Sequence, residues 1–388
     1  MNMNRVIVLA VVGLVIATMV AGCCTTGTVS EFAYVSNEDS NNLNAYSISA
    51  ATGALTQVTG SPFAGDTGPR GVAVNPSGTF LYMANESSND VSAYTIDASS
   101  GALTPVAGSP FPAGTGSCEE LSATSACGPR GVAVDPTGNF VYVANELSNN
   151  VSAFSFDANS GVLTLLAGSP FADTSEGPTG PRGVAVDPSG KYVYVTNHTS
   201  NDVAAYSITP ATGALTPIQG SPFPTGQTPF DVVVDPSGAF VYVTNHLSGN
   251  VSAYTLAAAT GALTPVEGSP FTAGSEPHGV VVDPSGKYVY VANHASDNVS
   301  AYSITAATGA LTELAGSPFA DTSSLQEEGA TAPYGLAVDP SGMFVYVANF
   351  GTDDVSAFSL DATSGALTEV GTFAAGTGPH GVAVVRPQ

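Results

Sequence analysis

The stretch GVAVDPSGKYVYVTNHTSNDVAAYSITPATGALTPIQGSPF, residues 183–223, contains four short segments with the composition of β-strands. β-Branched and aromatic residues are frequent in each segment, and Gly, Pro, Asn and Ser separate one segment from the next. Near copies of this unit recur along the chain, and the aromatic residue that opens the second segment stands at Phe32, Phe80, Phe140, Tyr192, Phe240, Tyr288 and Phe344. One unit of four short strands is therefore repeated seven times.

This repetition predicts an all-β protein with the architecture of a β-propeller. Four antiparallel strands per unit are typical of a propeller blade, whereas a linear stack of units needs distinct polar caps at its two ends. Here the ends complement each other, because the first unit starts at Phe32 without its first strand and residues 378–384 (GPHGVAV) supply a spare one. We predict a seven-bladed β-propeller over residues 32–388, whose C-terminal strand completes the N-terminal blade and hides two sheet edges. A β-solenoid is the alternative.

The repeated segments resemble those of a known family. YVTN occurs at residues 194–197 and 242–245, VYVAN stands at equivalent places, and variants of TGALTPVAGSPF close the units. These motifs are similar to the YVTN-repeat β-propellers and to the seven-bladed lactonase family that includes 6-phosphogluconolactonase. The resemblance covers residues 32–388 and implies the propeller fold. It also implies an activity, the hydrolysis of a lactone.

Two positions of the unit vary while their neighbours are nearly copied. The first position, just before the GVAV strand, holds Arg70, Arg130, Arg182, Phe230, His278, Tyr334 and His380. The second, just after the Asn that ends the next strand, holds Glu38, Glu86, Glu146, His198, His246, His294 and Phe350. In an antiparallel blade both positions emerge on one face, and the innermost strand places the first beside the central channel. All five histidines of the chain are among these fourteen residues, which we call the mouth residues.

The mouth residues predict a binding site for a small anionic ligand, since arginines bind carboxylates and phosphates and histidine exchanges protons near neutral pH. Lactone hydrolysis needs a cation for the developing oxyanion and a base that activates water. The family resemblance implies these roles for His380, Arg70 and Glu86, and Arg130 and Glu146 repeat the Arg-to-Glu spacing. The other predicted ligand-binding residues are Arg182, His198, Phe230, His246, His278, His294, Tyr334 and Phe350.

Two alternatives concern the same residues. Arg70–Glu86 and Arg130–Glu146 are also spaced to form ion pairs that tie neighbouring loops together. The histidines of three adjacent blades form an arc that is an alternative metal site, although we predict no cofactor. Elsewhere in the unit, the Asp of the DPSG segment is predicted to form a turn (Asp135, Asp187, Asp235, Asp283 and Asp339). The Asn that ends the second strand is predicted to hydrogen-bond loop backbone.

The N-terminus predicts export from the cytoplasm. Residues 1–22 have a basic start, an apolar run and a small-residue end, as in a signal peptide, and VAGC at residues 20–23 resembles the bacterial lipobox. This resemblance implies cleavage before Cys23 and lipidation of its thiol, followed by a tether over residues 23–31. An uncleaved membrane anchor is the alternative. We expect a monomer anchored by lipid in the cell envelope, at the outer membrane or cell surface, and a disulfide between Cys118 and Cys127.

The net charge of the chain restricts the kinds of molecule that it can bind. Seven Lys and Arg residues oppose 31 Asp and Glu residues, a formal net charge of −24, which argues against binding to nucleic acid. Two function classes remain. One is an exported lactonase-like hydrolase that acts on a small anionic lactone. The other is a non-catalytic propeller that binds a ligand or an envelope or extracellular partner in adhesion or scaffolding.

Overall fold

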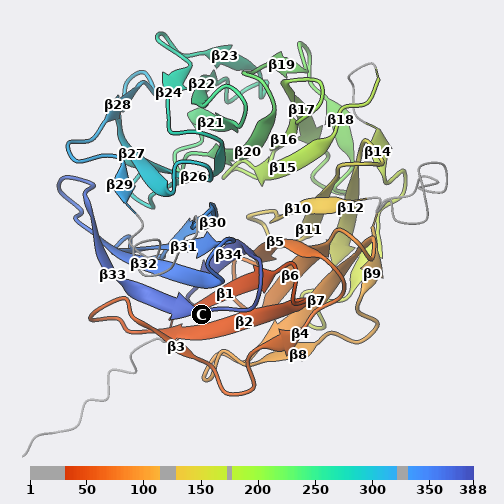
Figure 1. Ribbon diagram of the computed structural model, residues 1–388. Helices are drawn as coiled ribbons and strands as arrows, with labels where there is room; N and C mark the ends of the chain where they lie inside the picture. The colour runs from red at the N-terminus through yellow and green to blue at the C-terminus, as the bar shows by residue number, and fades with distance from the viewer. Residues whose placement is uncertain (1–30, 114–127, 173–176, 321–330) are drawn as a thin grey trace, which may run out of the picture.

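The computed structural model describes residues 31–113, 128–172, 177–320 and 331–388. These residues form seven antiparallel sheets arranged as blades around one axis, with the blades following one another in chain order (Figure 1). The predicted seven-bladed propeller is therefore confirmed. The predicted signal peptide (residues 1–22), the predicted lipidation site Cys23, and the predicted disulfide of Cys118 and Cys127 lie outside the described residues. No helix within the described ranges is long and apolar enough to cross a membrane.

The first three blades share one order of strands from the axis outward. Blade 1 consists, from the axis outward, of β34 (Pro379–Val385), β1 (Glu31–Asn37) and β2 (Asn42–Ile48), followed by the short strands β3 (Leu55–Gln57) and β4 (Phe63–Ala64), which both pair with β2. Blade 2 consists of β5 (Pro69–Val74), β6 (Phe80–Asn85), β7 (Asp90–Ile96), β8 (Leu103–Pro105) and β9 (Phe111–Pro112). Blade 3 consists of β10 (Pro129–Val134), β11 (Phe140–Asn145), β12 (Asn150–Phe156), β13 (Leu163–Leu165) and β14 (Phe171–Ala172).

The remaining four blades follow the same order. Blade 4 consists of β15 (Pro181–Val186), β16 (Tyr192–Asn197), β17 (Asp202–Ile208), β18 (Leu215–Pro217) and β19 (Phe223–Pro224). Blade 5 consists of β20 (Pro229–Val234), β21 (Phe240–Asn245), β22 (Asn250–Leu256), β23 (Leu263–Pro265) and β24 (Phe271–Thr272). Blade 6 consists of β25 (Pro277–Val282), β26 (Tyr288–Asn293), β27 (Asn298–Ile304), β28 (Leu311–Glu313) and β29 (Phe319–Ala320). Blade 7 consists of β30 (Pro333–Val338), β31 (Phe344–Asn349), β32 (Asp354–Leu360) and β33 (Leu367–Ala374).

The ring is closed by the two ends of the described chain. Strand β34 pairs antiparallel with β1, from Phe32 opposite Val385 to Asn37 opposite Pro379. It also contacts the inner strands on either side, β30 and β5. The C-terminal strand thus becomes the innermost strand of the N-terminal blade, as predicted, and it covers the edge that β1 would otherwise leave unpaired.

The fourth strand of the unit is interrupted in most blades. In six blades it is divided into two short pieces that both pair with the third strand, as β3 and β4 do with β2. The Gly-Ser-Pro segment causes the division, since proline has no N–H for the ladder. The Ser61 hydroxyl instead accepts a hydrogen bond from the Ala45 N–H at 2.9 Å. Blade 7 lacks this segment, and its β33 runs without a break.

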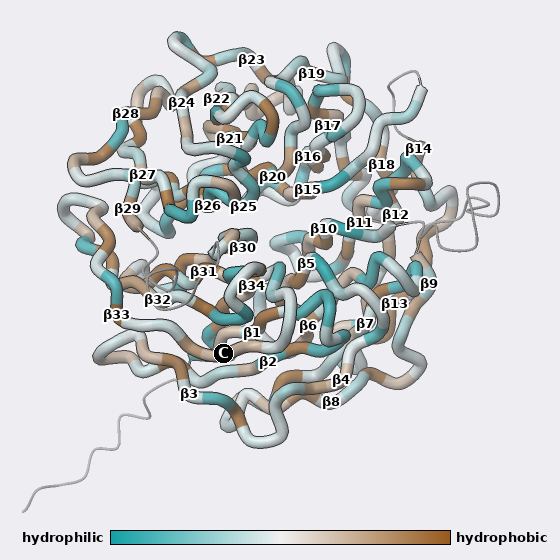
Figure 2. The backbone as a smooth tube through the Cα atoms, in the orientation of Figure 1, coloured by the Kyte–Doolittle hydropathy of each residue, from teal (hydrophilic) through white to brown (hydrophobic). Residues whose placement is uncertain are grey.

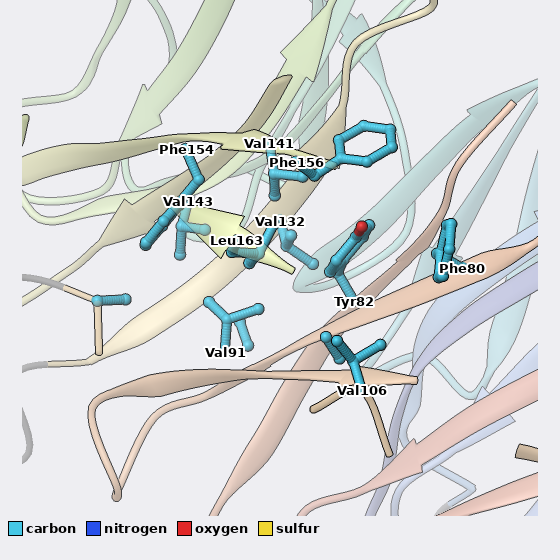
Figure 3. Packing of buried hydrophobic residues seen from close by; sticks show 13 residues of the cluster. Phe80, Tyr82, Val91, Val106, Val132, Val141, Val143, Phe154, Phe156 and Leu163 are labelled. Atoms are coloured by element: carbon cyan, nitrogen blue, oxygen red, sulfur yellow. The ribbon is translucent and has the colours of Figure 1, made fainter. Parts of the chain in front are cut away.

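Hydrophobic cores lie between adjacent blades. Figure 3 shows one of them, in which Phe80 and Tyr82 of blade 2 pack with Val141 and Phe156 of blade 3. In Figure 2 hydrophobic residues are concentrated in the strands. The second strand of each blade carries a buried tyrosine whose hydroxyl donates to a glycine carbonyl of the next blade, and Tyr346 does so across the closure, to Gly53 at 2.9 Å. The aromatic residues of the repeat are therefore core between blades, as predicted.

The turns of the unit are held by side chains. The carboxylate of Asp187 accepts hydrogen bonds from the Lys191 and Tyr192 N–H groups, both at 2.7 Å, which confirms its predicted role in the DPSG turn. The Asn that ends the second strand hydrogen-bonds loop backbone in part of the blades, as predicted, and the Gly226 N–H donates to Asn245 Oδ1 at 3.1 Å. It also has a side-chain partner across the hairpin, and Asn197, for example, donates to the Asp202 carboxylate at 2.7 Å. This bond fixes the turn that presents the second mouth position.

Candidate functional site

Each inner strand carries a β-bulge at the first mouth position. In blade 3, Pro129 lies opposite Asn145 and Val132 lies opposite Val143, so the inner strand has one extra residue between these pairs. The same shift occurs in the other six inner strands. A bulge bends the strand and turns a side chain away from the regular alternation. The repeated sequence thus forms the same bulge in all seven blades, and each bulge presents the side chain of the first mouth position.

The residue after the first mouth position is glycine in six blades because the inner strands approach closely there. A Cβ atom on Gly71 would lie 2.4 Å from the carbonyl oxygen of Arg130, and one on Gly335 would lie 2.4 Å from that of His380. Blade 5 differs, since Asp231 occupies this place. Asp231 was not among the predicted site residues, although PFDVVV at residues 229–234 against PRGVAV in other blades marks the departure.

The inner strands enclose a cavity of about 180 Å³ on the propeller axis. Its polar and aromatic lining comes from Arg130, Arg182, Phe230, Asp231, Tyr334 and His380. The rest of the lining is glycine, valine and leucine of the inner strands. Five of the seven residues at the first variable position therefore line the channel, and Arg70 and His278 are not part of this lining. Asp231 adds a carboxyl group that the repeat pattern does not contain.

The arginines and glutamates form one continuous chain of ion pairs across four blades. Arg70 bridges two carboxylates, with Nη2 2.6 Å from Glu38 Oε1 and Nε 2.5 Å from Glu86 Oε2. Arg130 likewise bridges Glu86, at 2.9 Å, and Glu146. Each glutamate thus belongs to a chain rather than to a pair within one blade.

Arg182 of blade 4 ends this chain, with Nη2 2.8 Å from Glu146 Oε1. The predicted ion pairs Arg70–Glu86 and Arg130–Glu146 are present, and further pairs join neighbouring blades. Three guanidinium charges therefore face three carboxylates, all largely buried. An anionic ligand would compete with the glutamates for these arginines. Burial also raises the pKa of Glu38 in spite of the attraction of Arg70.

Rings from blades 5, 6, 7 and 1 close the other side of the mouth. His278 stacks on Phe230 with ring centroids 4.1 Å apart and planes 6° apart. Tyr334 meets His278 edge-on at 4.2 Å and lies 3.9 Å from His380. Phe350 lies 5.9 Å from Tyr334. These rings form the ring cluster, which also includes His246 and His294.

The two sides of the mouth meet at two places. The Arg182 guanidinium lies 5.0 Å from the centre of the Phe230 ring, within the range of a cation–π contact. On the far side, His380 of blade 1 lies beside Arg70 of blade 2. Burial and the positive charge of Arg70 lower the pKa of His380. His198 lies near Arg182 and Glu146, whose charges act on its pKa. The structure therefore brings all the predicted site residues to one mouth.

Three histidines of the mouth are held neutral, His198, His278 and His380. Burial, followed by the charges of nearby groups, lowers the pKa of His278 and of His380 well below the usual value of 6.5. Burial and Arg182 lower the pKa of His198 to about 4. Neither ring nitrogen of His278, nor Nε2 of His380, has a hydrogen-bond partner among the described residues. Such buried, unpartnered nitrogens are typical of groups that await a ligand or water.

Glu276 joins the predicted histidine arc from the loop before β25. Its Oε2 lies 3.6 Å from His246 Nε2 and 3.4 Å from His294 Nδ1. This residue was not predicted, because its position, two residues before the first mouth position, is glycine in four of the seven blades. In the part of the chain that the structure describes, no three or more His, Cys, Asp or Glu side chains are placed to hold a metal ion.

We expect the stability of the protein to depend on His278 in acid. In the unfolded chain His278 takes up a proton near pH 6.5, whereas burial in the folded protein keeps it neutral. The free energy of unfolding of the wild type therefore decreases as the pH falls below 6.5. His278→Phe removes this effect while keeping a ring beside Phe230. Between pH 7 and pH 5 the wild type should lose about 2 kcal/mol relative to the variant. Urea unfolding at both pH values measures this difference, and parallel losses in the two proteins would contradict it.

The fold and the mouth define a seven-bladed β-propeller with a polar and aromatic site at its central channel. The chain belongs to the lactonase family of 7-bladed β-propellers, whose model matches residues 26–118, 111–273, 269–324 and 319–385. The family resemblance in the sequence is thereby confirmed.

Two curated relatives are 6-phosphogluconolactonases. The chain is 29% identical to that of Pectobacterium atrosepticum over 118 residues, which are 29% of this chain and 34% of the relative. It is 27% identical to that of Pectobacterium carotovorum over 120 residues, with the same shares. The alignments thus span about a third of each curated relative.

Solved structures share the fold over most of the chain. A putative 6-phosphogluconolactonase from Bacteroides uniformis has a TM-score of 0.74 at 18% identity, covering 92% of this chain and 100% of its own. The periplasmic gluconolactonase of Pseudomonas aeruginosa has a TM-score of 0.73 at 20% identity, covering 92% of this chain and 99% of its own. At these identities the similarity shows a common fold.

Proposed function

We propose that this protein hydrolyses a small lactone at the mouth of its central channel. The observation that carries the proposal is a buried, neutral His380 that lines the cavity on the axis and lies close to Arg70 of the Arg70–Glu86 ion pair. Membership of the lactonase family supports it. The names of the relatives, 6-phosphogluconolactonase and gluconolactonase, point to the same reaction class.

The proposed reaction uses the groups as the structure holds them. Neutral His380 accepts a proton from a water molecule through Nε2, which has no partner among the described residues, and the water attacks the lactone carbonyl carbon. The Arg70 guanidinium, held between Glu38 and Glu86, stabilises the oxyanion of the tetrahedral intermediate. The ring C–O bond then breaks, and the leaving oxygen takes the proton back from His380. The product is an open-chain hydroxy acid.

A second candidate function is binding without catalysis. The glutamates satisfy the arginines within the mouth, and the ring cluster packs the histidines against each other. This arrangement suits a site that recognises a ligand, in an adhesion or scaffolding propeller. It also weakens the expectation of an anionic substrate, since an anion must displace carboxylates from the arginines.

We further propose that the protein works outside the cytoplasm, attached by lipid on Cys23 to the outer membrane or cell surface. The basic start, apolar run and VAGC segment of residues 1–23 support this proposal. A radiolabelled fatty acid should label the wild type but not Cys23→Ala. Equal labelling of the two proteins would refute lipidation at this residue.

The test of the proposed hydrolase is the turnover of a lactone panel by the protein starting after Cys24. The Arg70→Ala/Glu86→Ala double variant removes an ion pair from the mouth, and we expect it to lower kcat/KM by about 100-fold or more. The matched control is Arg386→Ala/Glu31→Ala, which removes an ion pair at the opposite end of β1. It should keep kcat/KM within about threefold of the wild type.

Three outcomes distinguish the candidates. Turnover that persists with chelator and collapses in the mouth variant supports a lactonase that needs no metal. Turnover lost with chelator moves the chemistry to a metal. Absence of turnover on every lactone of the panel contradicts the hydrolase and leaves the binding propeller.

A further inference from the structure

Asp231 departs from the repeat at a position where side-chain space is scarce. The six equivalent residues are glycine, and a Cβ on several of them would collide with the neighbouring backbone. In blade 5 the aspartate is accommodated, and it lines the cavity on the axis. A side chain that is present in one blade of seven at the channel wall has no role in the repeated framework.

The carboxyl group of Asp231 is held in a fixed orientation. Its Oδ1 accepts a hydrogen bond from the Val232 N–H at 2.9 Å, and its Oδ2 accepts one from the Val280 N–H of blade 6 at 3.2 Å. A carboxylate has about four acceptor sites, so two bonds leave acceptor capacity on both oxygens. The group is thus both oriented and incompletely satisfied.

No cation neutralises this carboxylate among the described residues, in contrast to every glutamate of the ion-pair chain. Burial of an unpaired carboxylate is unfavourable, and it raises the pKa of Asp231 to about 6. The chain therefore keeps a costly group where glycine fits in six other blades. Such a cost is typical of a functional residue.

The surroundings indicate which ligand group Asp231 would contact. Arg130 and Arg182 line the same cavity while their glutamate partners do not, so a cationic ligand would face the guanidinium groups and meet repulsion there. A neutral donor, such as a hydroxyl group, meets no such repulsion and satisfies the free acceptor sites. The cavity of about 180 Å³ exceeds the roughly 150 Å³ that admits a benzene ring in other proteins. A six-membered ring that carries hydroxyl groups therefore fits in size and chemistry.

We propose that Asp231 is the specificity-determining residue of the channel, accepting a hydrogen bond from a ligand hydroxyl and selecting hydroxylated rings over rings without hydroxyls. The proposal rests on the same cavity as the proposed function and names the substrate class more closely. It does not depend on hydrolysis, because a binding propeller would use the same contact.

The test compares two stable rings that are not lactones, 1,5-anhydro-D-glucitol and tetrahydropyran, by calorimetry and saturation-transfer NMR. At pH 7.5 the wild type should bind the hydroxylated ring at least tenfold more tightly. In Asp231→Gly, which restores the residue of the other six blades, the preference should shrink to within about twofold. Asp231→Asn, which keeps one acceptor oxygen, should be intermediate. At pH 5, where Asp231 is protonated, the wild-type preference should fall at least threefold.

The alternative is that Asp231 only ties blade 5 to blade 6 through the Val280 N–H. In that case Asp231→Gly changes the unfolding midpoint and leaves the preference as in the wild type, which overturns the proposal. A wild type that shows no preference overturns it too. If the preference depends on Asp231 but no lactone is turned over, the hydrolase fails and this inference stands. If lactones are hydrolysed while Asp231→Gly keeps the wild-type preference, the inference alone fails.

Discussion

Deletion of residues 379–388, which removes β34, is expected to abolish the cooperative unfolding transition of the propeller. Blade 1 would lose its innermost strand, and β1 would expose a full edge of unpaired backbone groups. The cores on both sides of blade 1 would lose their contacts with Val382, Val384 and Val385. The inner strands β30 and β5 would also lose the neighbour that joins them. Denaturant unfolding followed by circular dichroism, together with size-exclusion chromatography, measures the result.

A circular permutant provides the matched control. Placing β34 before β1 and joining them by a turn like residues 187–191 gives blade 1 the strand order of the other blades. This protein keeps every strand and should unfold cooperatively, near the midpoint of the wild type. If the deleted chain also unfolds cooperatively, at a similar midpoint, then β34 is dispensable and ring closure does not hold the fold together.

The second large effect is expected for Gly71→Ala, which should destabilise the protein by about 3 kcal/mol. The new Cβ would lie 2.4 Å from the carbonyl oxygen of Arg130, and that oxygen belongs to the inner strand of the next blade. A backbone atom cannot rotate away as a side chain can, so the two inner strands must separate. Urea unfolding at pH 7 measures the loss.

Asp231→Ala is the control for this variant, because it places the same methyl group at the equivalent position of blade 5. That position already carries a Cβ, so no new backbone collision arises. The substitution also removes a buried carboxylate that lacks a cation, and we expect the free energy of unfolding to stay level or rise. If Gly71→Ala and Asp231→Ala lowered the free energy of unfolding equally, the close approach of the inner strands would not be the cause of the loss in Gly71→Ala.

The fold and the face of the site followed from local patterns. Four strand segments in each unit, turn residues between them and a spare strand at residues 378–384 were sufficient for the ring and its closure. The mouth positions were also visible in the sequence, because Arg182 and its counterparts vary beside copied neighbours. The second piece of the fourth strand, which follows Ser61 and Pro62, was not predicted, because two residues are too few to show strand alternation.

The contacts that the mouth residues make with other blades could not be predicted from the sequence in the same way. Spacing suggested that Arg130 pairs with Glu146, which is sixteen residues away in the same blade. The structure adds Glu86 of the preceding blade, and a contact of this kind depends on how the blades pack. The stacking of His278 on Phe230 and the approach of Glu276 to His246 have the same origin.

The sequence by itself therefore determined a seven-bladed ring, its closure and the face that carries the variable side chains, since repetition and strand alternation are local properties of the chain. Tertiary structure alone decided that the arginines are neutralised by glutamates of the same or a neighbouring blade, that His278 and His380 are neutral, and that Asp231 lies buried at the channel with no cation beside it among the described residues. Charge pairing and burial depend on distances between blades, and the residues that set these distances are far apart in the sequence.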